Sequence, residues 1–371
     1  MIAHKKQLKT DLSIFLVIVA MLLIVGLLFI YSSSSVFALE KLGSAHYFFK
    51  KQLVGLVLGL IAIMALRIIP FELIKKTAPL FFLVSLVLTA IATFSPLGQN
   101  IHGSSRWLSL PFLSFQPSEL LKISLILYIA YFLTKKEKQG SSFLHGFLPL
   151  LIVLGITSVI LLKQPDFGLT VTLVATAFII MFIANRYIKY IGFALLACIP
   201  LLIALVVAKS YRTKRILTFL NPWADAQGAG FQIIQSLIAI GSGGFFGAGI
   251  GESKQKFFYL PMQHTDFIFS IIAEETGFLG ASFVILLFLL FLYFGLRIAW
   301  QLTDNFSLFA TVGFVTVISL QALINILVTT GLAPTKGIGL PFISYGNTAL
   351  TCQLIMVGLI IAMVRENGAR S

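Results

Sequence analysis

Charged residues are scarce in this sequence. Only 11% of its 371 residues are charged and 58% are hydrophobic, whereas a soluble domain typically has about 25% charged and about 45–50% apolar residues. No globular core of this length could bury that much apolar surface. The composition therefore excludes a soluble globular protein and predicts an all-α polytopic membrane protein, with residues 1–371 forming a single integral membrane domain.

Cysteine and metal-ligand clusters are also lacking. Cys198 and Cys352 both lie inside apolar runs, so they say nothing about redox compartment and are not expected to bind a metal. The sequence has no zinc-type cluster, no Gly-x-Ser-x-Gly motif and no Ser-His-Asp order. The segment 241–251 holds six glycines but no nucleotide-binding glycine motif. We expect tight turns there, or a close approach of its backbone to a substrate or a helix.

Acidic residues are outnumbered by basic ones. The chain has 27 Lys and Arg against 13 Asp and Glu, a formal net charge of +14. In a soluble protein this excess would suggest nucleic acid. In a membrane protein it favours anionic lipid headgroups or a phosphate-bearing lipid substrate as partners, and no nucleic acid.

Long hydrophobic runs, by contrast, recur along the chain. A helix that spans a bilayer needs about 20 apolar residues, and about ten segments meet this need: 12–33, 50–70, 78–95, 117–134, 144–162, 167–184, 189–208, 266–297, 306–329 and 345–364. The first follows three lysines, and we interpret it as an uncleaved helix because it is too long for a signal peptide and more spans follow. An even number of spans places both termini on one side.

The distribution of Lys and Arg indicates which side that is. Cytoplasmic termini would put 14 of the 27 inside and 13 outside, and six of those 13 lie in the segment 209–265 between helices 7 and 8. Without that segment the split is 14 to 7, which favours cytoplasmic termini. The segment 209–265 is then a large extracytoplasmic loop. Residues 231–240 within it are apolar but too short to span, which suits a re-entrant or interfacial helix.

Asp266 is the most informative single residue, because a carboxyl group at the edge of hydrocarbon is costly without a function or a partner. On a helix, Glu275 falls on the opposite side, among large apolar residues, so we expect it to pair with a basic or amide group from another helix. Glu274 lies about 80° round from Asp266. Small and polar residues line the side of Asp266: Ser270, Ala273, Gly277 and Gly280. Spacing alone leaves two interpretations open for Asp266, an N-terminal helix cap and a functional carboxylate.

Several other polar residues lie in the predicted outside loops or at helix ends. Glu119 and Lys122 are three residues apart, which predicts a local ion pair. Asp166 follows a proline at a helix start and suits a cap. Arg106, beside a tryptophan, suits an interfacial anchor or a guanidinium clamp for a phosphate. His264 lies two residues before Asp266 and could be structural or could tune the aspartate.

The remaining basic candidates suit anionic ligands. Arg212, Lys214 and Arg215 could hold a diphosphate or lipid headgroups, and the sequence does not decide between them. Lys336 is a single cation in a small turn-forming loop, a context that suits access to an anionic ligand.

Five motifs together resemble a known family. They are Gly103-Ser-Ser-Arg-Trp107, Gln116-Pro-Ser-Glu-Leu-Leu-Lys122, Gln164-Pro-Asp-Phe-Gly168, His264-Thr-Asp-Phe-Ile-Phe269 with Glu274-Glu275-Thr-Gly277, and Pro334-Thr-Lys-Gly with Pro-Phe-Ile-Ser-Tyr-Gly346. In this order and over nearly the whole chain, they resemble the shape, elongation, division and sporulation (SEDS) family, which includes FtsW, RodA and SpoVE. The Pro-Asp-Phe-Gly and Pro-Thr-Lys-Gly sequences are more similar to those of FtsW than to those of RodA. Asn347-Thr348 departs from the family pattern of a second glycine and a serine.

The resemblance implies a ten-helix peptidoglycan glycosyltransferase of the bacterial cytoplasmic (inner) membrane. It would polymerise lipid II on the outer face, in division, with a class B penicillin-binding protein and other division proteins as partners. Asp266 matches the family's essential aspartate. The motifs also make Glu119, Asp166, Glu274, Glu275 and Ser344 candidate substrate-binding residues, beside His264 and the cations. The growing lipid-linked glycan would be the second substrate, and a divalent cation (Mg or Mn) could assist.

The expected reaction inverts the donor sugar in one displacement. A carboxylate must then accept the proton of the acceptor 4-hydroxyl, and cations must stabilise the leaving diphosphate. Asp266 suits the first task; the candidates for the second are Arg106, Lys122, Arg212, Lys214, Arg215 and Lys336. Two alternatives are a lipid II flippase, which should need charges through the inner half of the bilayer, and a scaffold for a penicillin-binding protein, which would not need the Asp266 carboxylate.

Overall fold

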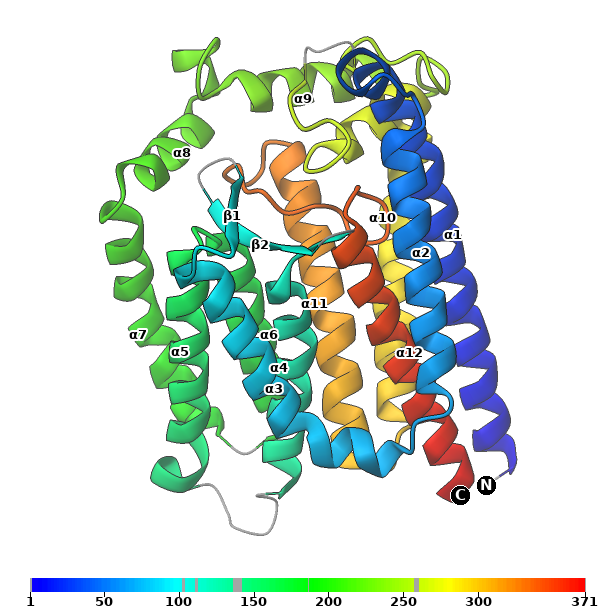
Figure 1. Ribbon diagram of the computed structural model, residues 1–371, viewed down its shortest axis with the longest axis vertical. Coiled ribbons are helices and arrows are strands. Elements are labelled where there is room, and N and C mark those ends of the chain that lie inside the picture. Colours follow the sequence, from blue (N-terminus) through cyan, green and yellow to red (C-terminus); the bar gives the residue numbers. More distant parts are fainter. Residues whose placement is uncertain are drawn as a thin grey trace.

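The computed structural model describes residues 2–101, 104–110, 113–135, 142–185, 187–256 and 260–370. It is a bundle of long helices whose two termini lie at the same end (Figure 1). The helices of the bundle are α1 (Ile2–Leu42), α2 (Tyr47–Leu66), α3 (Phe71–Phe94), α4 (Pro117–Lys135), α5 (Leu148–Lys163), α6 (Phe167–Ile183), α7 (Ile188–Val207), α10 (Ile268–Trp300), α11 (Asn305–Thr329) and α12 (Asn347–Arg370). Each overlaps one predicted span, although α1 and α3 begin well before the predicted spans at 12–33 and 78–95. The common end of the termini agrees with an even number of spans.

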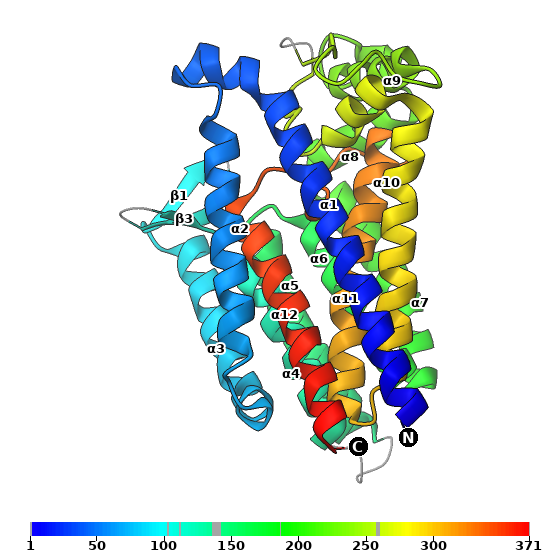
Figure 2. The ribbon, with the colours of Figure 1, turned by 90° about the vertical axis from the view of Figure 1, so that its right-hand side faces the viewer.

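The bundle has a buried centre and an apolar perimeter. In the described part of the chain, nine helices are long and apolar enough to cross a membrane, and α6 is shorter at 17 residues. Helices α4, α11 and α12 are mostly buried, whereas α2 and α7 expose most of their apolar side chains. An exposed apolar perimeter of this kind is stable only in lipid. Helix α12 packs along α2, and α1 packs along α10 (Figure 2).

The segment between α7 and α10 covers the end of the bundle opposite the termini (Figure 1). It contains α8 (Ser210–Leu220), a 3₁₀ helix (Pro222–Asp225) and α9 (Phe231–Gly243). Helix α9 confirms the short apolar helix predicted at 231–240. Its 13 residues extend for about 20 Å at 1.5 Å per residue, less than the hydrocarbon thickness of a bilayer.

A small sheet, not predicted from the sequence, lies between α3 and α4. Strands β1 (Gly98–Ile101), β2 (Ser104–Leu110) and β3 (Leu113–Phe115) form an antiparallel sheet in the order β1-β2-β3. Gln99 pairs with Trp107, and Leu108 with Phe115. Gly103 of the predicted motif lies outside the described residues. The sheet matters because β2 carries Arg106 toward the turn between α5 and α6.

Helix α10 is not the continuous helix predicted from residue 266. It begins at Ile268 and is interrupted at Gly277, whose φ of 66° and ψ of −162° are not helical. The glycine-rich segment replaces the helical hydrogen bonds at the break: the Phe278 and Leu279 amides donate to the carbonyls of Gly244 and Phe245, while the Ala248 and Gly249 amides donate to the carbonyls of Glu274 and Glu275. All four backbone bonds are 2.9–3.3 Å long.

Glycine is required on both sides of this break. A Cβ at Gly277 would lie 2.4 Å from the Gly247 nitrogen, and a Cβ at Gly247 would lie 2.3 Å from the Glu275 oxygen. Both glycines also have positive φ, which other residues adopt only at a cost. The predicted close backbone approach to a helix is therefore confirmed, and it divides α10 into a short part before Gly277 and a longer part after it.

Candidate active site

Asp266 lies immediately before α10, where three elements meet. The Asn325 amide of α11 donates to the Asp266 carbonyl at 2.8 Å and to the Ile338 carbonyl at 2.7 Å. The Ser344 hydroxyl donates to the Thr265 carbonyl at 2.5 Å and accepts from the Leu340 amide at 2.7 Å. The backbone of Asp266 is thereby fixed to α11 and to the loop that precedes α12.

The carboxylate of Asp266 does not cap α10. The cap residue of α10 is Phe267, and no side chain caps this end, so the capping interpretation of Asp266 is wrong. The carboxylate forms no hydrogen bond or ion pair with any residue in the described part of the chain, and the residue is partly exposed. Gly337 lies against it, because a Cβ there would be 3.4 Å from Asp266 Oδ2.

Burial raises the pKa of Asp266 to about 6, from an ordinary value of 3.8. The positive charges of Arg106 and Arg215 oppose this shift, and the negative charge of Asp166 adds to it. A carboxyl with this pKa is largely ionised at neutral pH yet more basic than an ordinary aspartate, which suits a general base.

Arg106 clamps the turn between α5 and α6. Its Nε donates to the Gln164 carbonyl at 3.0 Å, its Nη2 donates to the Pro165 carbonyl at 2.8 Å, and its Nη1 lies 3.5 Å from Asp166 Oδ2. Asp166 in turn accepts from the Leu169 amide at 3.1 Å and caps α6. The predicted cap is confirmed. Arg106 therefore holds the backbone of the α5–α6 turn in place, and its positive charge also acts on Asp266.

Three further cations gather around the start of α6. Lys336 and Arg212 both lie over the ring of Phe167, each 5.3 Å from its centre, and Arg215 Nη1 donates to the Thr335 carbonyl at 3.1 Å. Burial lowers the pKa of Lys336, as desolvation does for any amine. This group of cations adjoins Asp266, because the charge of Arg215 acts on its carboxylate and Gly337 lies against it. Lys214 instead forms an exposed ion pair with Asp225, at 3.3 Å.

Glu119 and Lys122 take a different role from the one expected for substrate-binding residues. They form the predicted ion pair, at 2.6 Å, and Lys122 also donates to Gln321 of α11 at 3.3 Å. Lys122 is only 1% exposed, so in this arrangement it cannot reach a leaving diphosphate. The pair neutralises two charges within the bundle and links α4 to α11.

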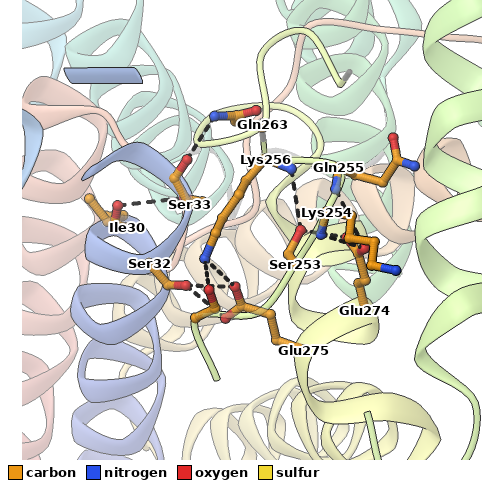
Figure 3. Close-up of polar contacts among 11 residues, drawn as sticks. Ile30, Ser32, Ser33, Ser253, Lys254, Gln255, Lys256, Gln263, Glu274 and Glu275 are labelled. Atoms are coloured by element: carbon orange, nitrogen blue, oxygen red, sulfur yellow. Dashed lines mark hydrogen bonds and ion pairs between the residues drawn. The ribbon is translucent and has the colours of Figure 1, made fainter. Parts of the chain in front are cut away.

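Glu274 and Glu275 hold the 251–256 segment against the bundle (Figure 3). Glu274 accepts from the Ser253 hydroxyl at 2.5 Å and from the Lys254 amide at 2.9 Å. Glu275 pairs with Lys256 at 3.2 Å and accepts from Ser32 of α1 at 2.7 Å. The expected basic partner of Glu275 exists, but it comes from the loop, and both glutamates are buried structural groups.

His264 forms part of an aromatic wall beside Asp266. Its ring centre lies 4.4 Å from that of Phe48 and 5.7 Å from that of Phe37. Its Nδ1 is buried without a hydrogen-bond partner. Burial lowers the pKa of His264 to about 4, so the ring is neutral at neutral pH. It shapes the wall and adds no charge to tune the aspartate.

The expected divalent cation finds no protein-built site in the described part of the chain. That part contains no group of three or more His, Cys, Asp or Glu side chains that could hold a metal ion. Asp166, the carboxylate whose charge acts on Asp266, is already bonded to Arg106 and to the start of α6. These residues do not fit a metal held by the protein alone.

The chain is similar to known proteins over nearly its whole length. Residues 13–368 match the FtsW, RodA and SpoVE family of cell cycle proteins. A "Probable peptidoglycan glycosyltransferase FtsW" of Geobacter sp. (strain M18) is 41% identical over 93% of this chain and 94% of its own. The stage V sporulation protein E of Bacillus subtilis (strain 168) is 40% identical over 96% of this chain and 98% of its own.

Solved structures share the fold. A chain of a peptidoglycan synthase complex, described for its coordination of polymerization and crosslinking, aligns with a TM-score of 0.77 and 29% identity, over 95% of this chain and 97% of that one. The rod shape determining protein RodA of Thermus thermophilus aligns with a TM-score of 0.71 and 24% identity, over 95% and 96%. The chain therefore belongs to the FtsW, RodA and SpoVE family of cell cycle proteins.

Proposed function

We propose that this chain is a peptidoglycan glycosyltransferase that polymerises lipid II during cell division. The observation that carries the proposal is the unpaired Asp266 carboxylate, whose pKa is raised to about 6 and which lies near several cations. The names of the relatives support the reaction class, and FtsW relatives at 41% identity favour the division role.

In the proposed reaction, the 4-hydroxyl of the acceptor sugar attacks the anomeric carbon of the donor. Asp266 takes the hydroxyl proton as the new bond forms, and the bond between the anomeric carbon and the diphosphate breaks with inversion. No covalent enzyme intermediate is needed. General-base catalysis of this kind contributes about 10²–10⁴-fold to rate.

The leaving diphosphate gains negative charge in the transition state. Arg215 and Lys336 are the cations placed to stabilise it, because they flank the loop whose Gly337 lies against Asp266. Arg106 supports them by holding the turn that starts α6. Arg212 lies across Phe167 from Lys336 and is the fourth candidate.

The proposal includes a location and partners. Cytoplasmic termini would place Asp266 and the segment between α7 and α10 on the outer face of the cytoplasmic membrane, where lipid II would be polymerised. A similar chain belongs to a peptidoglycan synthase complex that coordinates polymerization with crosslinking. This favours a class B penicillin-binding protein as the crosslinking partner here, with other division proteins around it.

The test is a polymerisation assay with purified chain and lipid II. Glycan strands are expected from wild type and not from Asp266→Ala. Asp225→Asn is a matched control, because that carboxylate is exposed and belongs to the same segment between α7 and α10. Strands from Asp266→Ala at the wild-type rate would refute the role of Asp266 as the base. No strands from wild type would refute the proposal and favour a scaffold. Transfer of lipid II across vesicles without any strands would favour a flippase.

A further inference from the structure

A cavity lies against the hairpin formed by α1 and α2, and Asp266 is not among the residues that line it. It has a volume of about 710 Å³ and lies between α1, the start of α2 and the segment 250–256. Phe37, Phe48 and His264, which form the aromatic wall, do not line this cavity. The proposed polymerase reaction uses none of the groups that line this cavity.

The cavity is apolar toward the middle of the bundle and polar toward its outer end. Leu27 and Leu28 line the deeper part, and Ser32, His46 and Lys256 line the outer part. The apolar strip continues below the cavity along the same side of α1, where Ile24 is 64% exposed and Leu28 is 40% exposed. A ligand here would therefore have an apolar portion directed along α1 and a polar portion at the outer end.

The polar floor of the cavity is a satisfied network (Figure 3). Lys256 pairs with Glu275 and also donates to the Gly251 carbonyl, while Ser32 donates to the same glutamate. The charges of Lys256 and Glu275 cancel. The floor therefore offers no free charge to a ligand, and any charge selectivity must come from the rim.

The rim is basic. The His46 ring stacks on Tyr31, with ring centres 5.4 Å apart and planes 9° apart. Lys50 does not itself line the cavity, but it lies one helical turn further along α2 than the lining residue His46, on the same face. Lys50 is exposed and forms no ion pair within the described residues. Of the two acidic residues of the hairpin, Glu40 is paired with Lys41 at 3.7 Å, and Asp11 is paired with Arg297 at 2.9 Å near the other end of α1. Unbalanced positive charge thus remains where the cavity opens.

We propose that this cavity binds an anionic phospholipid, with its phosphate at the His46 and Lys50 rim and an acyl chain along Leu27, Leu28 and Ile24 of α1. The charge of the rim complements an anionic headgroup, and the exposed apolar strip needs a chain to cover it. A soluble phosphate compound would leave that strip bare. The bound lipid would also contact Gly251 and Lys256. It would thereby stabilise the segment 251–256, which the ion pair between Lys256 and Glu275 holds against α10.

The test measures lipid binding to the delipidated full-length chain in detergent by native mass spectrometry. Wild type is titrated with dioleoyl phosphatidylglycerol and, separately, with dioleoyl phosphatidylcholine. Lys50→Gln is expected to weaken phosphatidylglycerol binding about fivefold, the effect of one basic residue near an anionic surface, and to change phosphatidylcholine binding little. Leu28→Trp fills the apolar part and is expected to weaken both lipids. Lys254→Gln is the matched control. Like Lys50, Lys254 is exposed and is not among the residues that line the cavity, but it belongs to the segment 250–256 and not to α2.

Three results would overturn the proposal. The first is an unchanged preference for phosphatidylglycerol in Lys50→Gln. The second is equal weakening by Lys254→Gln, which would indicate a diffuse surface effect. The third is displacement of phosphatidylglycerol, one molecule for one, by undecaprenyl diphosphate at lower concentration, which would assign the cavity to a polyprenyl substrate or product instead. Because the readout is binding, failure here leaves the polymerisation assay unaffected.

Discussion

Asp266→Asn should make the protein more stable at neutral pH while it removes the proposed base. The folded protein disfavours the ionised carboxylate, because burial raises its pKa to about 6 from 3.8. A neutral amide of nearly the same shape avoids that penalty. A gain in stability together with a loss of activity is the pattern expected for a functional residue held in an unfavourable environment.

The magnitude follows from the two pKa values. The difference between 3.8 and about 6 corresponds to about 3 kcal/mol, at 1.36 kcal/mol for each pKa unit. Asp266 is partly exposed, so solvent screening reduces this figure, and we expect about 1–2 kcal/mol. The penalty is absent below pH 3.8, grows as the pH rises from 3.8 to 6, and is complete above it.

The assay is thermal unfolding of the purified proteins in one detergent, at pH 8 and at pH 4.5. At pH 8 the midpoint of Asp266→Asn should exceed that of wild type by roughly 2–6 °C, and at pH 4.5 most of the difference should disappear. Asp225→Asn should show no such gain, because its carboxylate is stabilised by Lys214 and by the Ala229 amide. A lower midpoint for Asp266→Asn at pH 8 would refute the claim that the carboxylate is unpaired and disfavoured.

Three further predictions concern activity and folding. The polymerisation rate should rise about tenfold per pH unit below about 6 and level off above it; a flat profile from pH 4.5 to 8 would exclude Asp266 as the titrating base. Arg106→Lys keeps the charge but loses the forked contacts with the α5–α6 turn, so the rate should fall roughly tenfold, and full activity would show that only the charge of Arg106 matters. Gly277→Ala should lower the thermal midpoint by several degrees, because its Cβ would clash with Gly247. Gly155→Ala, whose Cβ meets open space, is the control, and equal midpoints for the two variants would contradict the account of the break in α10.

Hydrophobic run length was enough to predict the bundle. Every predicted span contains a helix, and the short apolar run at 231–240 became α9, because length and apolarity alone determine whether a helix can span or must lie at the surface. The sheet around Arg106 could not be predicted in this way. Its strands are short, and their pairing depends on contacts between residues that are distant along the chain.

The candidate site was predicted in part. Local patterns identified Asp266, the Glu119–Lys122 pair and the Asp166 cap, since each depends on spacing within one helix or turn. The role of Asn325 was missed, because a lone amide within an apolar helix gives no sign that it will hold the backbone of Asp266 and of Ile338. The break at Gly277 was also missed. The glycines within 244–249 were the one sequence signal that could have indicated it. Helical periodicity does not predict backbone contacts between segments that are distant along the chain.

The central claim is that Asp266 accepts a proton from the acceptor hydroxyl, and the rate of glycan formation by Asp266→Asn tests it most directly. Wild type, Asp266→Asn and Asp225→Asn would be compared with lipid II at pH 7.5, in equal amounts of folded protein. The account predicts that Asp266→Asn loses at least about 100-fold in rate while remaining as stable as wild type or more stable, and that Asp225→Asn keeps the wild-type rate. A rate for Asp266→Asn within a few fold of wild type would contradict it.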